Sequence, residues 1–98
     1  MNGFDYQQID DVIHSRLRLA IMSALITAEQ MEFITLRNLI KATDGNLSAN
    51  LKKLEETGYI SVKKEFINRK PVSSYSLTQQ GKDAFAVYIE NLERLIKK

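Results

Sequence analysis

The sequence feature that most restricts the fold is a change of hydrophobic period at Gly58. Before this glycine, Leu47, Leu51 and Leu54 recur at i, i+4 and i+7, the spacing of one face of an α-helix. We expect that helix to cover residues 44–57 and to end at Gly58, because glycine readily adopts the left-handed backbone that closes a helix. Two groups of strand-forming residues follow: Tyr59, Ile60, Val62 and Phe66, and then Val72, Tyr75 and Leu77. The pattern predicts a one-sided helix that leads directly into a β-hairpin.

The residues between and after these strands predict the hairpin tip and a last helix. Residues 68–71 (NRKP) are typical of a turn and make the tip basic. Thr78 is expected to cap a final helix that runs from about Gln79 to the end of the chain. The apolar positions of that helix are Phe85, Tyr88, Ile89, Leu92, Leu95 and Ile96.

Helical patterns also precede the 44–57 segment. Residues 6–12 have apolar side chains at helical spacing, and residues 15–28 carry an i, i+4, i+8 stripe, with Ser15 or His14 as the cap between the two pieces. The first stripe is Ile9, Val12 and Ile13, and the second is Leu17, Ile21, Leu25 and Ala28.

The stretch from residue 33 to residue 44 is expected to hold a short strand and a short helix. Residues 33–35 (FIT) form a β-prone bridge. Thr35 then caps a helix, and Thr43 or Asp44 caps the 44–57 helix after a break at residues 43–46. The buried side of the short helix is expected to be Leu36, Leu39 and Ile40.

The predicted order is helix, helix, short strand, helix, helix, β-hairpin and long helix. This is the layout of a winged helix-turn-helix, a mostly α fold with a small β-hairpin wing (α+β), here with an added C-terminal dimerisation helix. A chain of 98 residues fits one domain. We divide it into an N-terminal helix or arm (1–14), a winged-helix core (15–78) and a C-terminal helix (79–98).

Positive charge is concentrated in the middle of the chain. Residues 1–34 carry a net charge of −3, and residues 83–98 a net charge of 0. Residues 35–82 contain nine Lys and Arg against four Asp and Glu, a net charge of +5. A local excess of this kind is typical of a segment that binds a polyanion; the alternative is a basic face that is only solvated.

The residue inventory argues against several kinds of site. The chain has no cysteine, so it offers no disulfide, thiolate metal ligand or redox switch, which suits a reducing cytosol. Because His14 is the only histidine, we expect no metal and no cofactor. Asp10 and Asp11 are adjacent and would point at different angles on a helix, a poor geometry for shared acid–base work. No nucleophile elbow or phosphate loop appears, so we expect no enzyme.

The apolar runs and the first residues give the expected location. Residues 1–6 lack the basic stretch and apolar run of a secretion signal. The longest apolar-rich stretch, residues 19–28, is too short to span a bilayer. We therefore expect a cytoplasmic protein without a membrane partner.

Three segments, in this order, resemble MarR-like winged-helix regulators. Residues 44–60 (DGNLSANLKKLEETGYI) resemble their recognition helix and first wing strand. Residues 75–82 (YSLTQQGK) resemble their second wing strand and the LTxxG start of their last helix, and residues 14–22 (HSRLRLAIM) the opening of their first domain helix. The likeness covers roughly residues 10–98. It implies a transcriptional regulator that binds double-stranded DNA, with a recognition helix at 44–57 and a wing at 61–78.

The chain departs from the MarR type in its length. MarR-type regulators are usually longer, with extended terminal helices that enclose a ligand pocket. This sequence resembles a short variant, so a small-molecule effector could exist but has no supporting residue. The related metal sensors of the ArsR type use cysteines or His/Asp clusters, which this chain does not offer.

Candidate base and phosphate contacts lie on the expected outer side of the 44–57 helix. That side presents Asn46, Ala49, Asn50 and Lys53, with Ser48 and Lys52 on its flanks. The asparagines suit the N6 and N7 edge of adenine and the alanine suits a thymine methyl, whereas the serine and the lysines suit phosphates. The alternative is that both asparagines are simply solvated. Arg37 and Lys41, on the preceding helix, either contact the DNA backbone or are solvated.

The hairpin tip is the second candidate contact. Arg69 and Lys70 are expected to reach the flanking minor groove or its phosphates, with Lys63 and Lys64 in support. The alternative is a mobile polar hairpin.

The terminal apolar stripes predict a homodimer. They extend beyond what the core of a 98-residue chain covers. A two-fold dimer would read an inverted repeat with half-sites about one helical turn apart. The candidate dimerisation residues are Ile9, Val12, Phe85, Tyr88, Ile89, Leu92, Leu95 and Ile96. Two alternatives stay open: the stripes pack on each other within one chain, or the winged helix is a protein-interaction module without DNA binding.

Overall fold

The computed structural model describes residues 3–97; Met1, Asn2 and Lys98, the outermost residues of the expected domain, lie outside this range. The elements are a 3₁₀ helix η1 (Tyr6–Gln8), α1 (Arg16–Thr27), β1 (Met31–Glu32), α2 (Phe33–Ile40), α3 (Asp44–Thr57), β2 (Ile60–Ile67), β3 (Lys70–Leu77) and α4 (Gln79–Ile96). The strands form one antiparallel sheet in the order β1-β3-β2. This arrangement confirms the predicted α+β winged helix with a C-terminal helix.

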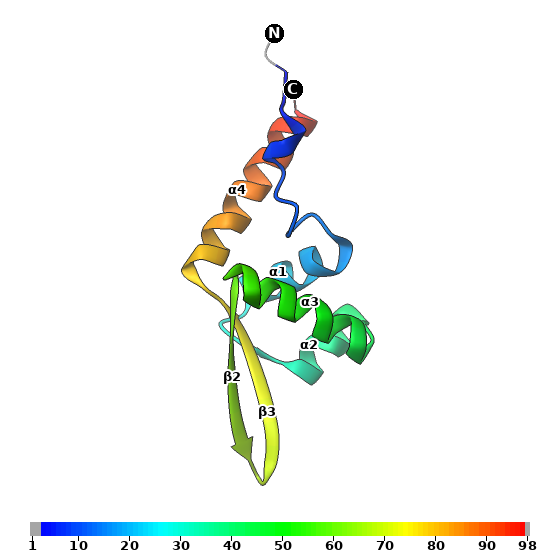
Figure 1. Ribbon diagram of the computed structural model, residues 1–98, viewed down its shortest axis with the longest axis vertical. Coiled ribbons are helices and arrows are strands. Elements are labelled where there is room, and N and C mark those ends of the chain that lie inside the picture. The colour runs from blue at the N-terminus through cyan, green and yellow to red at the C-terminus, as the bar shows by residue number, and fades with distance from the viewer. Residues whose placement is uncertain (1–2, 98) are drawn as a thin grey trace.

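The molecule is elongated, because the hairpin and α4 project from opposite ends of the central helices (Figure 1). Its extents are 61 × 25 × 21 Å and its radius of gyration is 15.0 Å, whereas a compact domain of this length has a radius of about 12.6 Å. The N-terminal segment lies beside the C-terminal half of α4, where Asn91 Nδ2 donates to the Gln8 carbonyl at 3.0 Å. The two ends of the chain therefore share one end of the molecule.

The core lies where α1, α2 and α3 meet the sheet. Leu47, Leu51 and Leu54 are all buried, which confirms the stripe expected for the 44–57 helix. The other buried apolar residues are Ile13, Ile21, Met22, Ala24, Leu25, Leu36, Ile60, Leu77 and Tyr88. No helix within residues 3–97 combines the length and the apolar character needed to cross a membrane.

Local signals set the ends of α3 and α4 as predicted. Thr43 Oγ1 accepts from the Asn46 amide at 3.2 Å, and Gly58 closes α3 in the left-handed region at φ 90°. Thr78 Oγ1 accepts from the Gly81 amide at 3.0 Å. Gly81 is needed for a second reason: a Cβ at this position would lie 2.0 Å from the Tyr59 carbonyl oxygen. Close approach of α4 to the end of α3 thus explains the glycine of the LTxxG motif.

The predicted helix over residues 6–12 is wrong. Only η1 forms, and a turn follows it in which Asp10 Oδ1 accepts from the amides of Val12 and Ile13 at 2.8 and 3.0 Å. This carboxylate satisfies amide groups that a helix would otherwise pair with backbone carbonyls. The turn directs Ile13 into the core. Ser15 does precede α1, but its side chain makes no capping hydrogen bond.

The prediction for residues 33–40 is also wrong in detail. The short strand is Met31–Glu32, which pairs with Tyr75 and Ser74 of β3, and α2 begins at Phe33, so Thr35 lies inside the helix and is not its cap. Leu36 is buried, but Leu39 is 59% exposed, contrary to the expected buried side. The position of β1 is decided by its pairing with β3, some 40 residues further along the chain. The β propensity of the local residues carries no information about that pairing.

Candidate nucleic-acid interface

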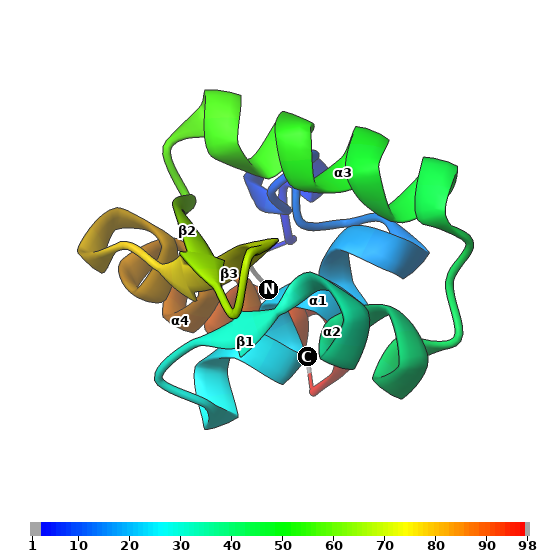
Figure 2. The same cartoon turned by 90° about the horizontal axis from the view of Figure 1, so that it is seen from below.

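The outer face of α3 is free of the rest of the chain. α3 runs along one side of the molecule, and no other element covers its outer side (Figure 2). The leucine stripe turns the opposite side into the core, so small and polar side chains face outward. The exposed residues of α3 are Asp44, Gly45, Asn46, Ser48, Ala49, Lys52, Lys53, Glu55 and Glu56, and Glu56 lies on the outer side one turn after Lys52 and Lys53.

The prediction that Asn50 lies on this outer face is wrong. Asn50 is half-buried at the border of the leucine stripe. Its Nδ2 donates to the Asn46 carbonyl at 2.8 Å, and its Oδ1 accepts from Arg18 Nη1 at 2.8 Å. Both ends of the amide are therefore occupied within the chain, and Asn50 holds α3 in place.

Sequence reasoning missed Arg18, the partner of Asn50. The Arg18 Nε also donates to the Val12 carbonyl at 2.5 Å. Its partners lie six residues before it and 32 residues after it. No helical or strand spacing links these positions, so the pattern of the chain carried no signal for the contact.

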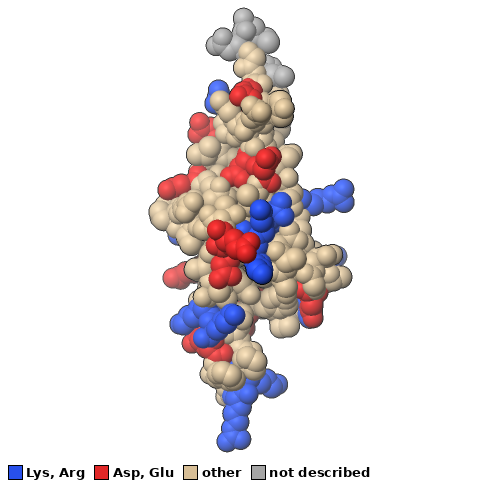
Figure 3. Space-filling view, viewed as in Figure 1, with Lys and Arg blue, Asp and Glu red and all other residues tan. Residues whose placement is uncertain are grey.

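The hairpin carries its charge at its tip. Asn68 and Arg69 form a two-residue turn with φ 52° and 65°, as in a type I′ turn, whose second position usually holds glycine. The tip is therefore Asn68-Arg69, and Lys70 already belongs to β3. Lys and Arg side chains mark this end of the molecule, while Asp and Glu side chains occur over the half that contains α4, across the middle and, beside basic side chains, on the upper part of the hairpin (Figure 3).

The sides of the hairpin are mixed in character. Lys63 and Lys64 are exposed and point to opposite faces of the strand. The Lys63 amine lies 3.7 Å from the Glu65 carboxylate, an exposed pair that contributes little to stability. Phe66, expected only as a strand former, is 80% exposed, and Ile67 is 46% exposed.

The predicted dimerisation residues divide into two groups. Ile9, Val12, Phe85 and Leu92 are half-buried and pack against the core of their own chain, and Leu95 is also half-buried. Ile89 is 39% exposed and Ile96 72% exposed, and Val87, which was not predicted, is 54% exposed. The free apolar surface of α4 is therefore narrower than the stripe suggested.

Tyr88 does not belong to that free surface. It is 1% exposed, and its hydroxyl lies 2.9 Å from His14 Nδ1. Burial raises the pKa of the Tyr88 phenol, and the charge of Asp10 raises it further. The prediction that Tyr88 lies at a dimer interface is wrong, because its side chain belongs to the core.

Asp10 connects the N-terminal arm to the end of α3. Its Oδ2 accepts from the Tyr59 hydroxyl at 2.5 Å, while its Oδ1 accepts the two amides of the turn. Burial, followed by this hydrogen bond and the carboxylate charge, raises the pKa of Tyr59 from about 10 to about 12. Asp10 is thus engaged as a structural acceptor. Within residues 3–97, no three His, Asp or Glu side chains gather as a metal site would require.

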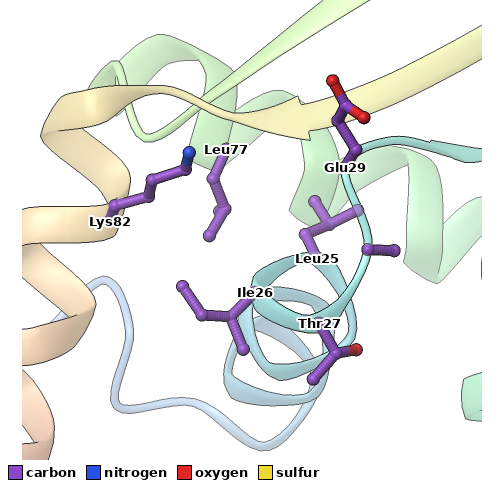
Figure 4. A pocket seen from close by; sticks show the side chains of 7 residues that line it. Leu25, Ile26, Thr27, Glu29, Leu77 and Lys82 are labelled. Carbon is purple, nitrogen blue, oxygen red and sulfur yellow. The ribbon is translucent and has the colours of Figure 1, made fainter.

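An open pocket lies between the end of α1 and the beginning of α4 (Figure 4). Leu25, Ile26 and Leu77 form its apolar side, and Glu29 and Lys82 stand at its rim. None of its lining residues belongs to α3 or to the hairpin tip. The pocket is therefore separate from the candidate interface.

Comparisons with known proteins agree with this geometry. Residues 17–96 match the family described as winged helix DNA-binding domain. An uncharacterized protein of Methanocaldococcus jannaschii is 36% identical over 86 residues, which cover 88% of this chain and 94% of that protein.

Solved structures share the fold at lower identity. The transcriptional regulator homologue protein from Pyrococcus horikoshii OT3 superposes with a TM-score of 0.75 at 23% identity, over 93% of this chain and 95% of that one. The crystal structure of MarR superposes with a TM-score of 0.76 at 17% identity, over 91% of this chain but only 64% of the MarR chain. These likenesses confirm the MarR-like fold, and the family match shows that the chain belongs to the winged helix DNA-binding domain family.

Proposed function

We propose that the chain is a homodimeric transcriptional regulator that binds double-stranded DNA in a sequence-specific manner, without catalysis. The observation that carries the proposal is the uncovered, small and polar outer face of α3 beside a projecting hairpin with a basic tip. An α-helix about 10–12 Å across fits the major groove of B-DNA, about 12 Å wide. The family match and the transcriptional regulators among the structural neighbours support this reading.

The proposed contacts differ in kind along α3. Asn46 reads an adenine edge, and Ala49 allows close approach to a thymine methyl. Ser48, Lys52 and Lys53 contact phosphates and set the register of the helix in the groove. Asn50 does not contact DNA in this proposal. Its hydrogen bond to Arg18 fixes the position of α3 and therefore of its outer face.

The wing (61–78) adds contacts outside the major groove. Arg69 at the tip and Lys70 at the start of β3, both exposed, reach the flanking minor groove or its phosphates, and Lys63 supports them. A two-fold dimer through α4 would direct two recognition helices at an inverted repeat, with half-sites about 34–36 Å apart. The exposed side chains of Ile89 and Ile96, seven residues apart on one side of α4, supply the apolar part of that contact.

The proposed partners are duplex DNA and a second copy of the chain. No described residue supports a small-molecule effector, and the cytoplasmic location stays a prediction from the sequence. The alternative function is a protein-interaction module, and the exposed Phe66 and Ile67 are the observation that favours it. A mostly apolar protein contact of that kind would depend weakly on salt.

Salt dependence separates the two functions. Fluorescence anisotropy of a labelled duplex, measured over a series of salt concentrations, should show affinity that falls steeply as salt rises. Replacing Arg69 and Lys70 together by alanine should weaken duplex binding and make the salt dependence shallower. Lys97→Gln, at the opposite end of the molecule, is the matched control. Unchanged duplex affinity in the Arg69/Lys70 variant would exclude the wing as a contact.

A further inference from the structure

Lys41 ends α2 in a conformation that glycine adopts at lower cost. Its φ and ψ are 57° and 44°, in the left-handed region. Within residues 3–97, the non-glycine residues with positive φ are Lys41, Asn68 and Arg69. Two of these three are exposed cations, one in the turn before α3 and one in the hairpin that follows it. Lys41 and Arg69 therefore each combine an unfavourable backbone conformation with an exposed positive charge.

Lys41 also lines a recess at the beginning of α3. The recess has a volume of about 470 Å³ and lies between the first turn of α1, the α2–α3 turn and α3. We call it the basic recess and define it by its polar residues Arg16, Lys41, Thr43 and Asn46, above an apolar floor that includes Leu17 and Ala20. No Asp or Glu is among the lining residues.

The two cations of the basic recess are not neutralised by the described part of the chain. Asp44, the acidic residue that opens α3, is bound by Arg37 Nη1 at 2.8 Å. Arg16 and Lys41 take part in none of the three ion pairs formed within residues 3–97. The recess therefore presents positive charge beside Asn46, the residue proposed to read a base.

We propose that the basic recess binds a phosphodiester group of the DNA backbone. This inference rests on the proposed function and adds a contact to it. The α2–α3 turn and the hairpin lie at opposite ends of α3 (Figure 2). The recess and the wing tip therefore hold the backbone on both sides of the groove that α3 occupies. Arg16 offers a planar set of donors, and Lys41 a flexible point charge.

The strained position gives a substitution that separates binding from folding. Glycine accepts a positive φ freely and asparagine more readily than lysine, so Lys41→Gly and Lys41→Asn remove the charge without adding backbone strain. Lys41→Arg keeps the charge. Lys82→Gln removes an exposed lysine that belongs neither to the recess nor to the proposed interface, and it serves as the charge control.

The experiment measures binding of a fluorescein-labelled duplex of mixed sequence to the full chain over a series of salt concentrations, together with thermal unfolding. For Lys41→Gly and Lys41→Asn, the slope of log K against log salt should become shallower by about 0.9 per lost contact, hence about 1.8 for a dimer. At about 0.15 M salt each lost contact should reduce affinity about five-fold. Arg16→Gln should act likewise. Lys41→Arg and Lys82→Gln should bind as the wild type does, and Lys41→Gly should unfold at no lower temperature.

Two different results would contradict two different claims. If the wild type binds duplex in a salt-dependent way and Lys41→Gly and Lys41→Asn keep its slope and affinity, the basic recess does not hold a phosphate, and the proposed function stands. If the wild type shows no salt-dependent duplex binding, the proposed function fails and this inference fails with it.

Discussion

The Arg18 guanidinium donates to Asn50 Oδ1 at 2.8 Å and thereby joins α1 to α3. The same guanidinium binds the Val12 carbonyl, so the N-terminal arm is held at the same point. Asn50 in turn binds the carbonyl of Asn46, one turn earlier in α3. The side chain of Asn50, predicted to read a base, instead holds α3 in place within the chain.

The Arg18–Asn50 contact predicts a measurable coupling. Asn50→Ala removes two side-chain hydrogen bonds and should lower the free energy of unfolding by about 1–2 kcal/mol. Arg18→Ala should cost at least as much, because it also leaves the Val12 carbonyl without its donor. In a double-mutant cycle by urea unfolding, the coupling energy should be about 1–2 kcal/mol. Additive single and double variants would show that the contact contributes nothing in solution.

Two helical glycines should respond in opposite ways to alanine. At Gly81 a Cβ would lie 2.0 Å from the Tyr59 carbonyl oxygen, so Gly81→Ala should destabilise the fold by about 3 kcal/mol or more. At Gly45 a Cβ would meet nothing within 4 Å. Gly45→Ala should therefore be neutral or stabilise by up to about 1 kcal/mol, as expected for glycine in a helix. Thermal unfolding of both variants checks the pair, and equal effects would refute the close approach of α4 to Tyr59.

Tyr59 predicts a loss of stability at alkaline pH. Its pKa is about 12 in the folded chain and about 10 when unfolded, so the folded state holds the phenol proton more tightly. This contribution is complete below about pH 10 and is lost as the pH rises from about 10 to about 12. In urea unfolding at pH 9 and pH 11, Tyr59→Phe should lose less stability between the two than the wild type. Tyr75 and Tyr88, whose pKa values are also raised, contribute to the loss that remains. Equal losses in both proteins would contradict the assignment.

Substitutions of buried and of exposed apolar residues in α4 should have different effects, the first on stability and the second on dimerisation. Tyr88→Ala should lower the free energy of unfolding by about 3–5 kcal/mol, because it empties a buried site. Ile96→Asp, at a position 72% exposed, should leave unfolding of the monomer almost unchanged and should shift sedimentation from twice 11.2 kDa to 11.2 kDa. Glu90→Ala, exposed on the same helix, is the control. A wild type that sediments only as monomer at micromolar concentration would exclude the dimer.

Local signals made α3 and the hairpin predictable. The Leu47, Leu51 and Leu54 spacing, the Thr43 cap and Gly58 act within a few residues of one another, and the observed α3 has the predicted bounds of 44 and 57. The position of β1 depends on Tyr75, more than 40 residues away, and no local pattern reports that pairing.

Side-chain placement was less predictable than the elements. Asn50 lies next to Leu51 at the border of the buried stripe, where a helical repeat alone does not decide between core and solvent. Tyr88 continues the apolar stripe of α4, and the stripe cannot show that His14 and the N-terminal arm of the same chain cover it. These outcomes depend on which distant segment packs there, and periodicity carries no such information.

The central claim is that the outer face of α3 and the basic hairpin bind duplex DNA in a sequence-specific manner as a dimer. Selection of bound duplexes from a random pool tests it most directly, because one sequence profile reports binding, symmetry and specificity together. We predict enrichment of an inverted repeat whose half-site centres lie about 10 base pairs apart, with Asn46→Ala relaxing the preference at an adenine. Recovery of no duplex, or of duplexes without a common or symmetric sequence, would contradict the account.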